Sequence, residues 1–328
     1  MSDPLLEVRN LRIEFPTRRG TLVAVDDVSL TIAPGEVLGV VGESGAGKSL
    51  TGAAIIGLLE PPGRIAAGEI KLAGLRIDNL PYDDMRKIRG REIGAIFQDP
   101  LTSLNPLYTV GQQLVETVTT HLNMSAAAAR QRAVELLEAT GIPAAERRID
   151  HYPHQFSGGM RQRVVIALAL AAQPKLVIAD EPTTALDVSI QAQIISLLKT
   201  LCRDHGTAVM LVTHDMGVIA ETADRVAVMY AGRIVEIGPV ADVIHRPQHP
   251  YTVGLMGSIP SMVADVERLT QIDGAMPRLT AIPSGCAFHP RCVRVFERCT
   301  RERPDLMPAG TSRAACWLHE ASRLVRAA

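Results

Sequence analysis

Two stretches near the start of the chain, residues 5–15 and 22–32, alternate apolar and polar side chains. A period of two is typical of strands that bury one face, so we predict an antiparallel pair of strands here. A short, nearly continuous apolar run at Glu36–Val41 then indicates a buried strand. It is followed by a glycine-rich turn and by the apolar stretch Leu50–Leu59, which we predict to be a helix. Strand, glycine loop and helix in this order open an α/β unit.

The pattern becomes helical between about 100 and 170. Ser125 is expected to cap a helix over 126–139, and Ser157 to cap a second helix over 158–172, because a Ser side chain before a helix accepts a hydrogen bond from the first turn. We therefore expect this segment to be a helical insertion within the α/β fold.

After residue 174 the α/β alternation returns. Residues 175–179 and 207–212 are short apolar runs that indicate buried strands, and residues 188–204 carry the apolar stripe of an amphipathic helix. Residues 225–237 are typical of a hairpin that turns at an Ala-Gly pair. A mixed-sheet α/β core with an antiparallel β subdomain is the fold class that these patterns favour.

The composition changes near residue 240, where prolines begin to interrupt the chain and no long periodic segment is found. We place a core domain at 1–245 and a Cys- and Pro-rich C-terminal extension at 246–328. The extension is either loop-rich or partly disordered, and its four cysteines favour the first alternative.

The chain has 328 residues, with 34 Lys and Arg against 35 Asp and Glu, so its net charge is −1. This balance argues against non-specific binding of nucleic acid, which usually needs a surplus of basic side chains. An apolar content of 47% is ordinary for a packed protein and excludes disorder as the main state. We find neither a signal-peptide pattern nor an apolar run of the ~18 residues that span a membrane, and expect a cytosolic chain.

The segment after the third predicted strand matches the phosphate-loop pattern G-x-x-x-x-G-K-[ST] in full. Its glycines let backbone N–H groups point at phosphate oxygens, its lysine supplies a positive charge, and its serine hydroxyl can reach Mg²⁺. A fortuitous glycine turn is the alternative, and the strand before and helix after the loop argue against it. The matching residues are Gly42, Glu43, Ser44, Gly45, Ala46, Gly47, Lys48 and Ser49.

The apolar strand that precedes residue 181 ends in two carboxylates, Asp180 and Glu181. Asp180 is placed to hold Mg²⁺ through its water shell, and Glu181 to polarise a water for attack on the γ-phosphoryl group. The alternative interpretation is a solvated acidic pair without a function, and the presence of a phosphate loop earlier in the chain argues against it.

Between these motifs, Phe156–Arg163 contains Ser157-Gly158-Gly159-Met160 at a predicted helix start. Here the sequence resembles the ATP-binding subunits of ABC transporters, whose signature is L-S-G-G-Q. The resemblance covers about residues 5–240. It implies a P-loop ABC ATPase fold in which Ser157, Gly158 and Gly159 close over the ATP held by a partner subunit.

Other positions match the family one by one. Gln98 resembles the glutamine that touches Mg²⁺ and water, and His214 resembles the switch histidine that contacts the γ-phosphate. Asp187 resembles the aspartate of the subunit interface, and Phe15 the aromatic residue that stacks on adenine. The resemblance also places Leu50, beside the phosphate loop, among the nucleotide-binding residues.

A narrower resemblance, to peptide importers, is carried by Phe97–Pro106 and by His249–Thr252 with Leu255 and Ile259-Pro260. We interpret residues 249–260 as a proline-bounded helical hairpin with no ligand of its own. This branch implies di- or oligopeptides as cargo, with nickel or glutathione as alternatives.

The extension holds Cys286, Cys292, Cys299 and Cys316 in the pattern C-x5-C-x6-C-x16-C. Four thiolates can ligate an iron–sulfur cluster or Zn²⁺, and the spacing does not choose between them; unligated thiols are the third alternative. The peptide-importer resemblance favours a [4Fe–4S] cluster. Cys202 stands alone on a predicted helix and is expected in the core.

The resemblance implies an ATPase that energises a membrane importer with ATP and Mg²⁺. The implied partners are two integral-membrane permease subunits, a second ATPase that is a paralogue or another copy, and indirectly an extracytoplasmic solute-binding protein. The implied location is peripheral, on the cytoplasmic face of the plasma (inner) membrane. An exporter ATPase and a soluble ABC ATPase acting on nucleic acid or ribosomes are alternatives. The Cys-rich extension weighs against the first, and a single phosphate loop without heptads against the second.

Overall fold

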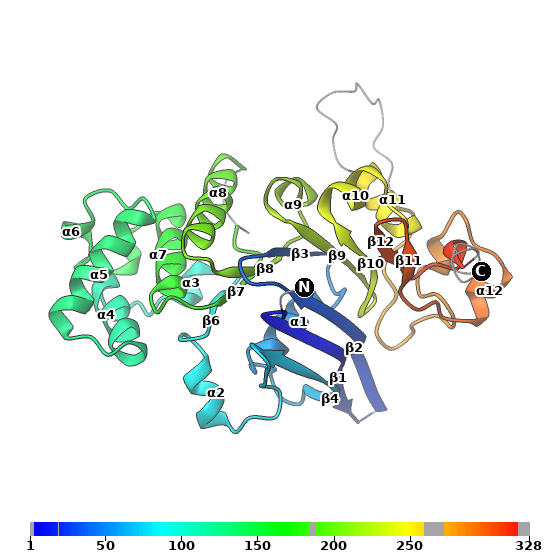
Figure 1. Ribbon diagram of the computed structural model, residues 1–328, viewed down its shortest axis with the longest axis horizontal. Helices are drawn as coiled ribbons and strands as arrows, with labels where there is room; N and C mark the ends of the chain where they lie inside the picture. Colours follow the sequence, from blue (N-terminus) through cyan, green and yellow to red (C-terminus); the bar gives the residue numbers. More distant parts are fainter. Residues whose placement is uncertain (1–2, 19, 184–187, 259–271, 321–328) are drawn as a thin grey trace. The chain divides into compact units, whose positions relative to one another are not determined.

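The computed structural model describes residues 3–18, 20–183, 188–258 and 272–320 (Figure 1). The chain forms two units. The first comprises Met1–Leu6, Thr31–Val37 and Lys71–Val212, and the second comprises Glu7–Leu30, Leu38–Ile70 and Thr213–Ala328.

The first unit is built on three parallel strands in the order β8-β7-β6. Their bounds are β6 (Ile93–Ile96), β7 (Leu176–Asp180) and β8 (Ala208–Val212). Nearly every residue of β7 and β8 is buried, as expected where apolar side chains cover both faces of a parallel sheet. The apolar runs at 175–179 and 207–212 are thus confirmed as strands to within one residue.

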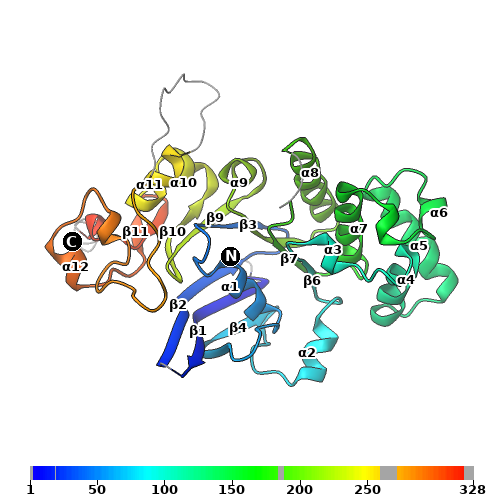
Figure 2. The ribbon, with the colours of Figure 1, turned by 180° about the vertical axis from the view of Figure 1, so that it is seen from behind.

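Helices make up most of the rest of this unit, and α4, α5 and α7 pack on one another in its green and cyan part (Figure 2). Ser125 caps α5 by accepting from the N–H of Ala128 at 3.3 Å, as expected from the sequence. The elements are β5 (Leu75–Arg76), α2 (Tyr82–Ile88), α3 (Pro100–Ser103), α4 (Val110–His121), α5 (Ala126–Ala139), α6 (Ala145–Arg148), η1 (Pro153–Gln155), α7 (Gly158–Leu170) and α8 (Val188–Asp204).

The second unit holds most of a sheet with the order β2-β1-β4 and a second set of strands with the order β11-β12-β10-β9-β3. Strands β3 and β9 are parallel, and the other pairs of the second set are antiparallel. The bounds are β1 (Leu6–Thr17), β2 (Gly20–Ile32), β3 (Val37–Val41), β4 (Arg64–Leu72), β9 (Arg225–Tyr230), β10 (Arg233–Pro239), β11 (Met307–Ala309) and β12 (Ser312–Ala314). The mixed α/β core and its antiparallel β part are confirmed.

The hairpin of β9 and β10 turns where the sequence indicated, at Ala231 and Gly232, whose φ angles are 47° and 80°. Two successive positive φ values match the turn that suits the twist of antiparallel strands. The helices of this unit are α1 (Lys48–Ile55), α9 (Met216–Thr222), α10 (Val240–His245), α11 (Pro250–Gly257), η2 (His289–Arg291), α12 (Glu297–Arg301) and η3 (Trp317–His319).

Three features differ from the sequence interpretation. The extension contributes strands, because β12 pairs with β10 through Ala314 opposite Glu236; three-residue strands are too short to give a visible alternation. Helix α1 ends at Ile55, since Gly57 takes a φ of 65° and turns the chain. Of the expected hairpin at 249–260, the described residues hold one helix, α11, and the remainder lies outside them.

No helix among the described residues is long and apolar enough to cross a bilayer.

Candidate functional site

The phosphate loop runs from the end of β3 to the start of α1. Gly42, Gly45 and Gly47 have φ angles of 152°, 82° and 100°, which side-chain-bearing residues rarely adopt. A Cβ atom on Gly42 would stand 2.2 Å from the backbone oxygen of Met229, so the loop also needs glycine for space. The glycines of the sequence motif are therefore required by the backbone path itself.

The ammonium of Lys48 is enclosed by this loop, with only 5% of the residue exposed. Its Nζ donates to the backbone oxygens of Gly42 at 2.8 Å and Glu43 at 3.1 Å. Ser49, the next residue, is exposed on the first turn of α1. A glycine-rich loop that encloses a cation and leads directly into a helix N-terminus is an arrangement that suits a polyphosphate.

Gln98 and Glu181 meet at the carboxyl ends of two neighbouring parallel strands, β6 and β7. The Nε2 of Gln98 donates to Oε2 of Glu181 at 3.0 Å. Ligands of α/β sheets bind at this edge of the sheet. The sequence placed both residues at one site, and the structure brings them into contact.

Glu181 has a φ of 45°, and its N–H donates to the backbone oxygen of Val212 at the end of β8 at 2.8 Å. A non-glycine residue in this region costs roughly 1–3 kcal/mol, and such strain gathers at functional sites. Asp180, the last residue of β7, is half-buried beside it.

The Ser-Gly-Gly segment forms the start of α7. Ser157 caps the helix by accepting from the N–H of Met160 at 3.4 Å, and Ser157 and Gly158 are exposed. Met160, where the family signature has Gln, accepts a hydrogen bond through its sulfur from Arg148 at 3.1 Å. The segment thus presents a capped, solvent-facing helix N-terminus in the first unit.

The remaining candidate residues of the nucleotide site lie on separate elements. His214 is exposed just after β8, in the second unit. The ring of Phe15 on β1 lies against Gly63, where a Cβ would stand 2.7 Å from its Cε1. Leu50 is half-buried on α1. Asp187 lies outside the described residues.

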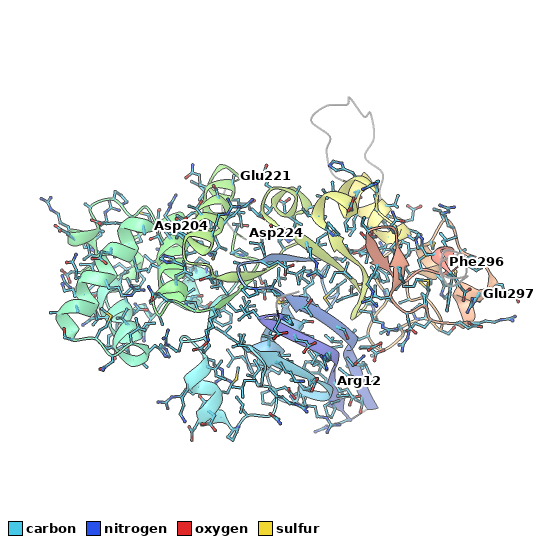
Figure 3. The ribbon with its side chains drawn as sticks, viewed as in Figure 1. Arg12, Asp204, Glu221, Asp224, Phe296 and Glu297 are labelled. Carbon is cyan, nitrogen blue, oxygen red and sulfur yellow. The ribbon has the colours of Figure 1, made fainter. Side chains whose placement is uncertain are left out.

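All four cysteines of the extension line one cavity, together with Phe288 and Trp317. Phe296, which also lines it, and Glu297 begin α12 in the orange part of the ribbon (Figure 3). Burial raises the pKa of Cys286 to about 11 and raises the pKa of Cys292 and Cys316 as well. Within the described ranges, no set of three or more His, Cys, Asp or Glu side chains is arranged to hold a metal ion.

Cys202 on α8 is buried in the core, as expected, and burial raises its pKa to about 12.

Two residues of the extension form hydrogen bonds with the phosphate loop, and neither was among the predicted site residues. Tyr251 and Arg291 bond to Glu43 across 208 and 248 sequence positions. Residues 249–260 were expected to form a helical hairpin with no ligand of its own, and the structure adds a bond from this segment, through Tyr251, to the phosphate loop. No periodicity or motif spacing reports a contact over such a separation.

Comparison with known proteins places the chain among transporter ATPases. Residues 25–184 match the family model "ABC transporter", and residues 235–299 match "Oligopeptide/dipeptide transporter, C-terminal region". The oligopeptide transport ATP-binding protein AppD of Bacillus subtilis is 48% identical over 96% of this chain and 97% of its own. The oligopeptide transport ATP-binding protein OppD of Escherichia coli is 49% identical over 92% of this chain and 90% of its own.

Among solved structures, the ATP-binding cassette MJ0796, a dimer in a post-hydrolysis state bound to ADP and Pi, superposes with a TM-score of 0.65 at 32% identity. The match covers 72% of this chain and 98% of that one. From the sequence identity over nearly the whole length and the two matched regions, the chain belongs to the ABC transporter ATP-binding proteins, in the branch that carries the oligopeptide/dipeptide transporter C-terminal region.

Proposed function

We propose that this protein hydrolyses MgATP and so drives the import of di- or oligopeptides through a membrane permease. The observation that carries the proposal is the phosphate loop closed around the buried ammonium of Lys48. The pairing of Gln98 with Glu181 at the carboxyl ends of parallel strands supports it.

Lys48 is the residue that neutralises the β- and γ-phosphates in this proposal, and Glu181 is the base that takes the proton from the attacking water. The hydrogen bond from Gln98 orients the Glu181 carboxylate. Ser49 in the second unit and Gln98 and Asp180 in the first each offer a hard oxygen donor that suits Mg²⁺, which would offset phosphate charge. His214 would stabilise the geometry around the γ-phosphate.

The exposed N-terminus of α7 supports a role for Ser157, Gly158 and Gly159 in a second subunit's site. Its backbone donors face solvent and favour an anion. The similar cassette MJ0796 is a dimer bound to ADP and Pi. We extend this arrangement to our chain, with Asp187 at the interface; the second ATPase is either a paralogue or another copy.

An exposed apolar group beside Gln98 supports docking to a permease. Leu101 on α3 is 63% exposed and Leu107 is 80% exposed, and both follow Gln98 within ten positions. Phe97 and Tyr108 are also exposed in this segment. Exposed apolar side chains mark interaction sites where they gather, and a contact in this segment would reach Glu181 through Gln98. We propose that the chain binds at the cytoplasmic face of the membrane, beside two permease subunits.

The cargo class is supported by the relatives, which are named as oligopeptide transport proteins, and by the match of residues 235–299. Within this proposal the core domain is 1–245 and the extension is 246–328. Uptake of labelled di- and oligopeptides by cells that carry or lack this chain tests the proposal directly. Uptake of nickel or glutathione instead of peptides would contradict the cargo, and co-purification with nucleic acid instead of membrane proteins would contradict the whole function.

We further propose that the four cysteines hold a [4Fe–4S] cluster. The supporting observation is that Cys286, Cys292, Cys299 and Cys316 line one cavity, since four thiolates can ligate such a cluster. Protein purified without oxygen should then contain iron and sulfide and absorb visible light. Stoichiometric zinc, or no metal, would contradict this.

A further inference from the structure

The phosphate loop is fixed from outside by the C-terminal extension, at the residue Glu43. The hydroxyl of Tyr251 accepts a hydrogen bond from the backbone N–H of Glu43 at 2.9 Å. The Nη1 of Arg291 donates to the two carboxylate oxygens of Glu43 at 3.0 and 3.1 Å. All three residues belong to the second unit. Both the backbone and the side chain of this loop residue are therefore positioned by the extension.

Arg291 itself is held rigidly, with only 8% of its side chain exposed. The guanidinium carbon lies 5.8 Å from the ring centre of Tyr230 and 5.9 Å from that of Phe288. Nη1 also donates to the hydroxyl of Tyr230 at 3.3 Å. The other nitrogens donate to the backbone oxygens of Asp273 (2.9 Å), Ile272 (3.4 Å) and Gly274 (3.3 Å). With so many bonds in its planar fork, Arg291 has little freedom to leave Glu43.

A second contact reaches the loop two residues further on. The Cε of Met276 lies 3.0 Å from where a Cβ atom on Gly45 would stand. The extension therefore packs on the loop at Gly45 as well as bonding to it at Glu43.

The charge of Glu43 gives the Arg291 contact a consequence for binding. Glu43 is a carboxylate within a loop whose other features favour a polyanion, and an unpaired negative charge there would repel one. Arg291 neutralises that carboxylate, while Lys48 donates to the backbone oxygens of Gly42 and Glu43.

We infer that Arg291 is a positioning residue of the nucleotide site, which keeps Glu43 neutralised and thereby sets the affinity of the phosphate loop for MgATP. The inference rests on the proposed function, since it takes the loop to bind ATP. It makes the C-terminal extension part of the nucleotide site and not only an appendage of the core domain.

The turn that carries Arg291 lies between two of the four cysteines. The N–H of His289 donates to the backbone oxygen of Cys286 at 2.9 Å, and that of Cys292 to the oxygen of His289 at 3.2 Å. The backbone that presents Arg291 is thus anchored on both sides at the cysteine cavity.

Equilibrium binding of a fluorescent ATP analogue with Mg²⁺ to the purified full chain tests the inference. Arg291→Gln should raise Kd about tenfold, the effect of one uncompensated charge near the phosphates. Adding Glu43→Gln to that variant should restore Kd to near the wild-type value, because the repelling carboxylate is gone. Arg301→Gln is the matched control: Arg301 lies on α12 of the same extension and pairs with Glu297. It should bind as the wild type does.

An unchanged Kd for Arg291→Gln would overturn the inference. So would a raised Kd that Glu43→Gln does not bring back to the wild-type value, since Arg291 would then only support the fold of the extension. If Arg291→Gln does not fold, Arg291→Lys replaces it: lysine keeps the charge but loses the planar fork, so Kd should rise by less than tenfold, and adding Glu43→Gln should remove the rise. An unchanged Kd, or a rise that Glu43→Gln does not remove, would contradict the inference. Failure of the wild-type chain itself to bind would overturn the proposed function instead.

Discussion

At the scale of single residues, buried charged groups in this protein are satisfied by the backbone. The carboxylate of Glu236 on β10 is fully buried and accepts from the N–H groups of Gln248 and His249 at 2.9 and 2.8 Å. The buried ammonium of Lys48 likewise donates hydrogen bonds to two carbonyl oxygens of the phosphate loop. Because a buried charge without partners is costly, these bonds fix the local geometry of both segments. The bonds to Glu236 hold the start of α11, and Tyr251 on this helix bonds to the phosphate loop.

His249 gives this region a pH dependence. Burial lowers its pKa to about 3, and its Nδ1 accepts from the N–H of Tyr251 at 3.1 Å as the cap of α11. The folded protein holds the neutral imidazole, so its stability is complete above the unfolded pKa of about 6.5 and falls as the pH drops from there towards 3. We expect a loss of about 1 kcal/mol between pH 7 and pH 5.5.

The control variant for this prediction is His249→Asn, which keeps a side chain able to cap α11 but cannot be protonated in this pH range. Thermal unfolding at both pH values should show a smaller drop in Tm for the variant. The neighbouring titratable groups Glu236 and His319 are unchanged in this variant. Burial raises the pKa of Glu236, so its contribution to the stability changes with pH in the opposite direction to that of His249. Equal drops in Tm would show that His249 does not titrate on unfolding.

Local spacing in the sequence identified the candidate site residues but not the residues that support the phosphate loop from outside. Lys48, Glu181 and Ser157 were found because their chemistry needs a fixed local spacing that the sequence displays. Tyr251 and Arg291 were not, because their roles depend on the folded path of the extension and on no local pattern.

At the scale of elements, helix caps and buried strands were predicted well. Ser125 and Ser157 start α5 and α7 because a side chain within three residues satisfies the first turn, which is a local rule. Strands β11 and β12 were missed because they are held by their pairing with β10 and not by their own pattern. Caps and apolar runs, which are local features of the sequence, therefore predicted α5, α7 and the buried strands. The strands of the extension could not be predicted, because they form by pairing with a distant strand.

The loop after α3 carries a prediction about docking. Leu107→Asp should leave ATP hydrolysis by the isolated chain unchanged, because the side chain is 80% exposed, but should abolish peptide uptake in cells. Val293→Asp, at a residue 96% exposed on the extension, is the matched control and should transport normally. Normal uptake with Leu107→Asp would place the permease contact elsewhere.

At the scale of the whole molecule, the nucleotide motifs are divided between the two units. The phosphate loop, His214 and the extension belong to the second unit, and Gln98, Glu181 and Ser157 belong to the first. The proposal that Glu181 is the base for the water links this residue of the first unit to the chemical step.

Parallel measurement of MgATP binding and MgATP turnover by Glu181→Gln tests that link most directly. We expect Kd to stay close to the wild-type value, because Lys48 and the loop are intact, and turnover to fall by a factor of about 100 or more, because the amide cannot accept the proton. Hydrolysis at the wild-type rate would contradict the assignment of Glu181.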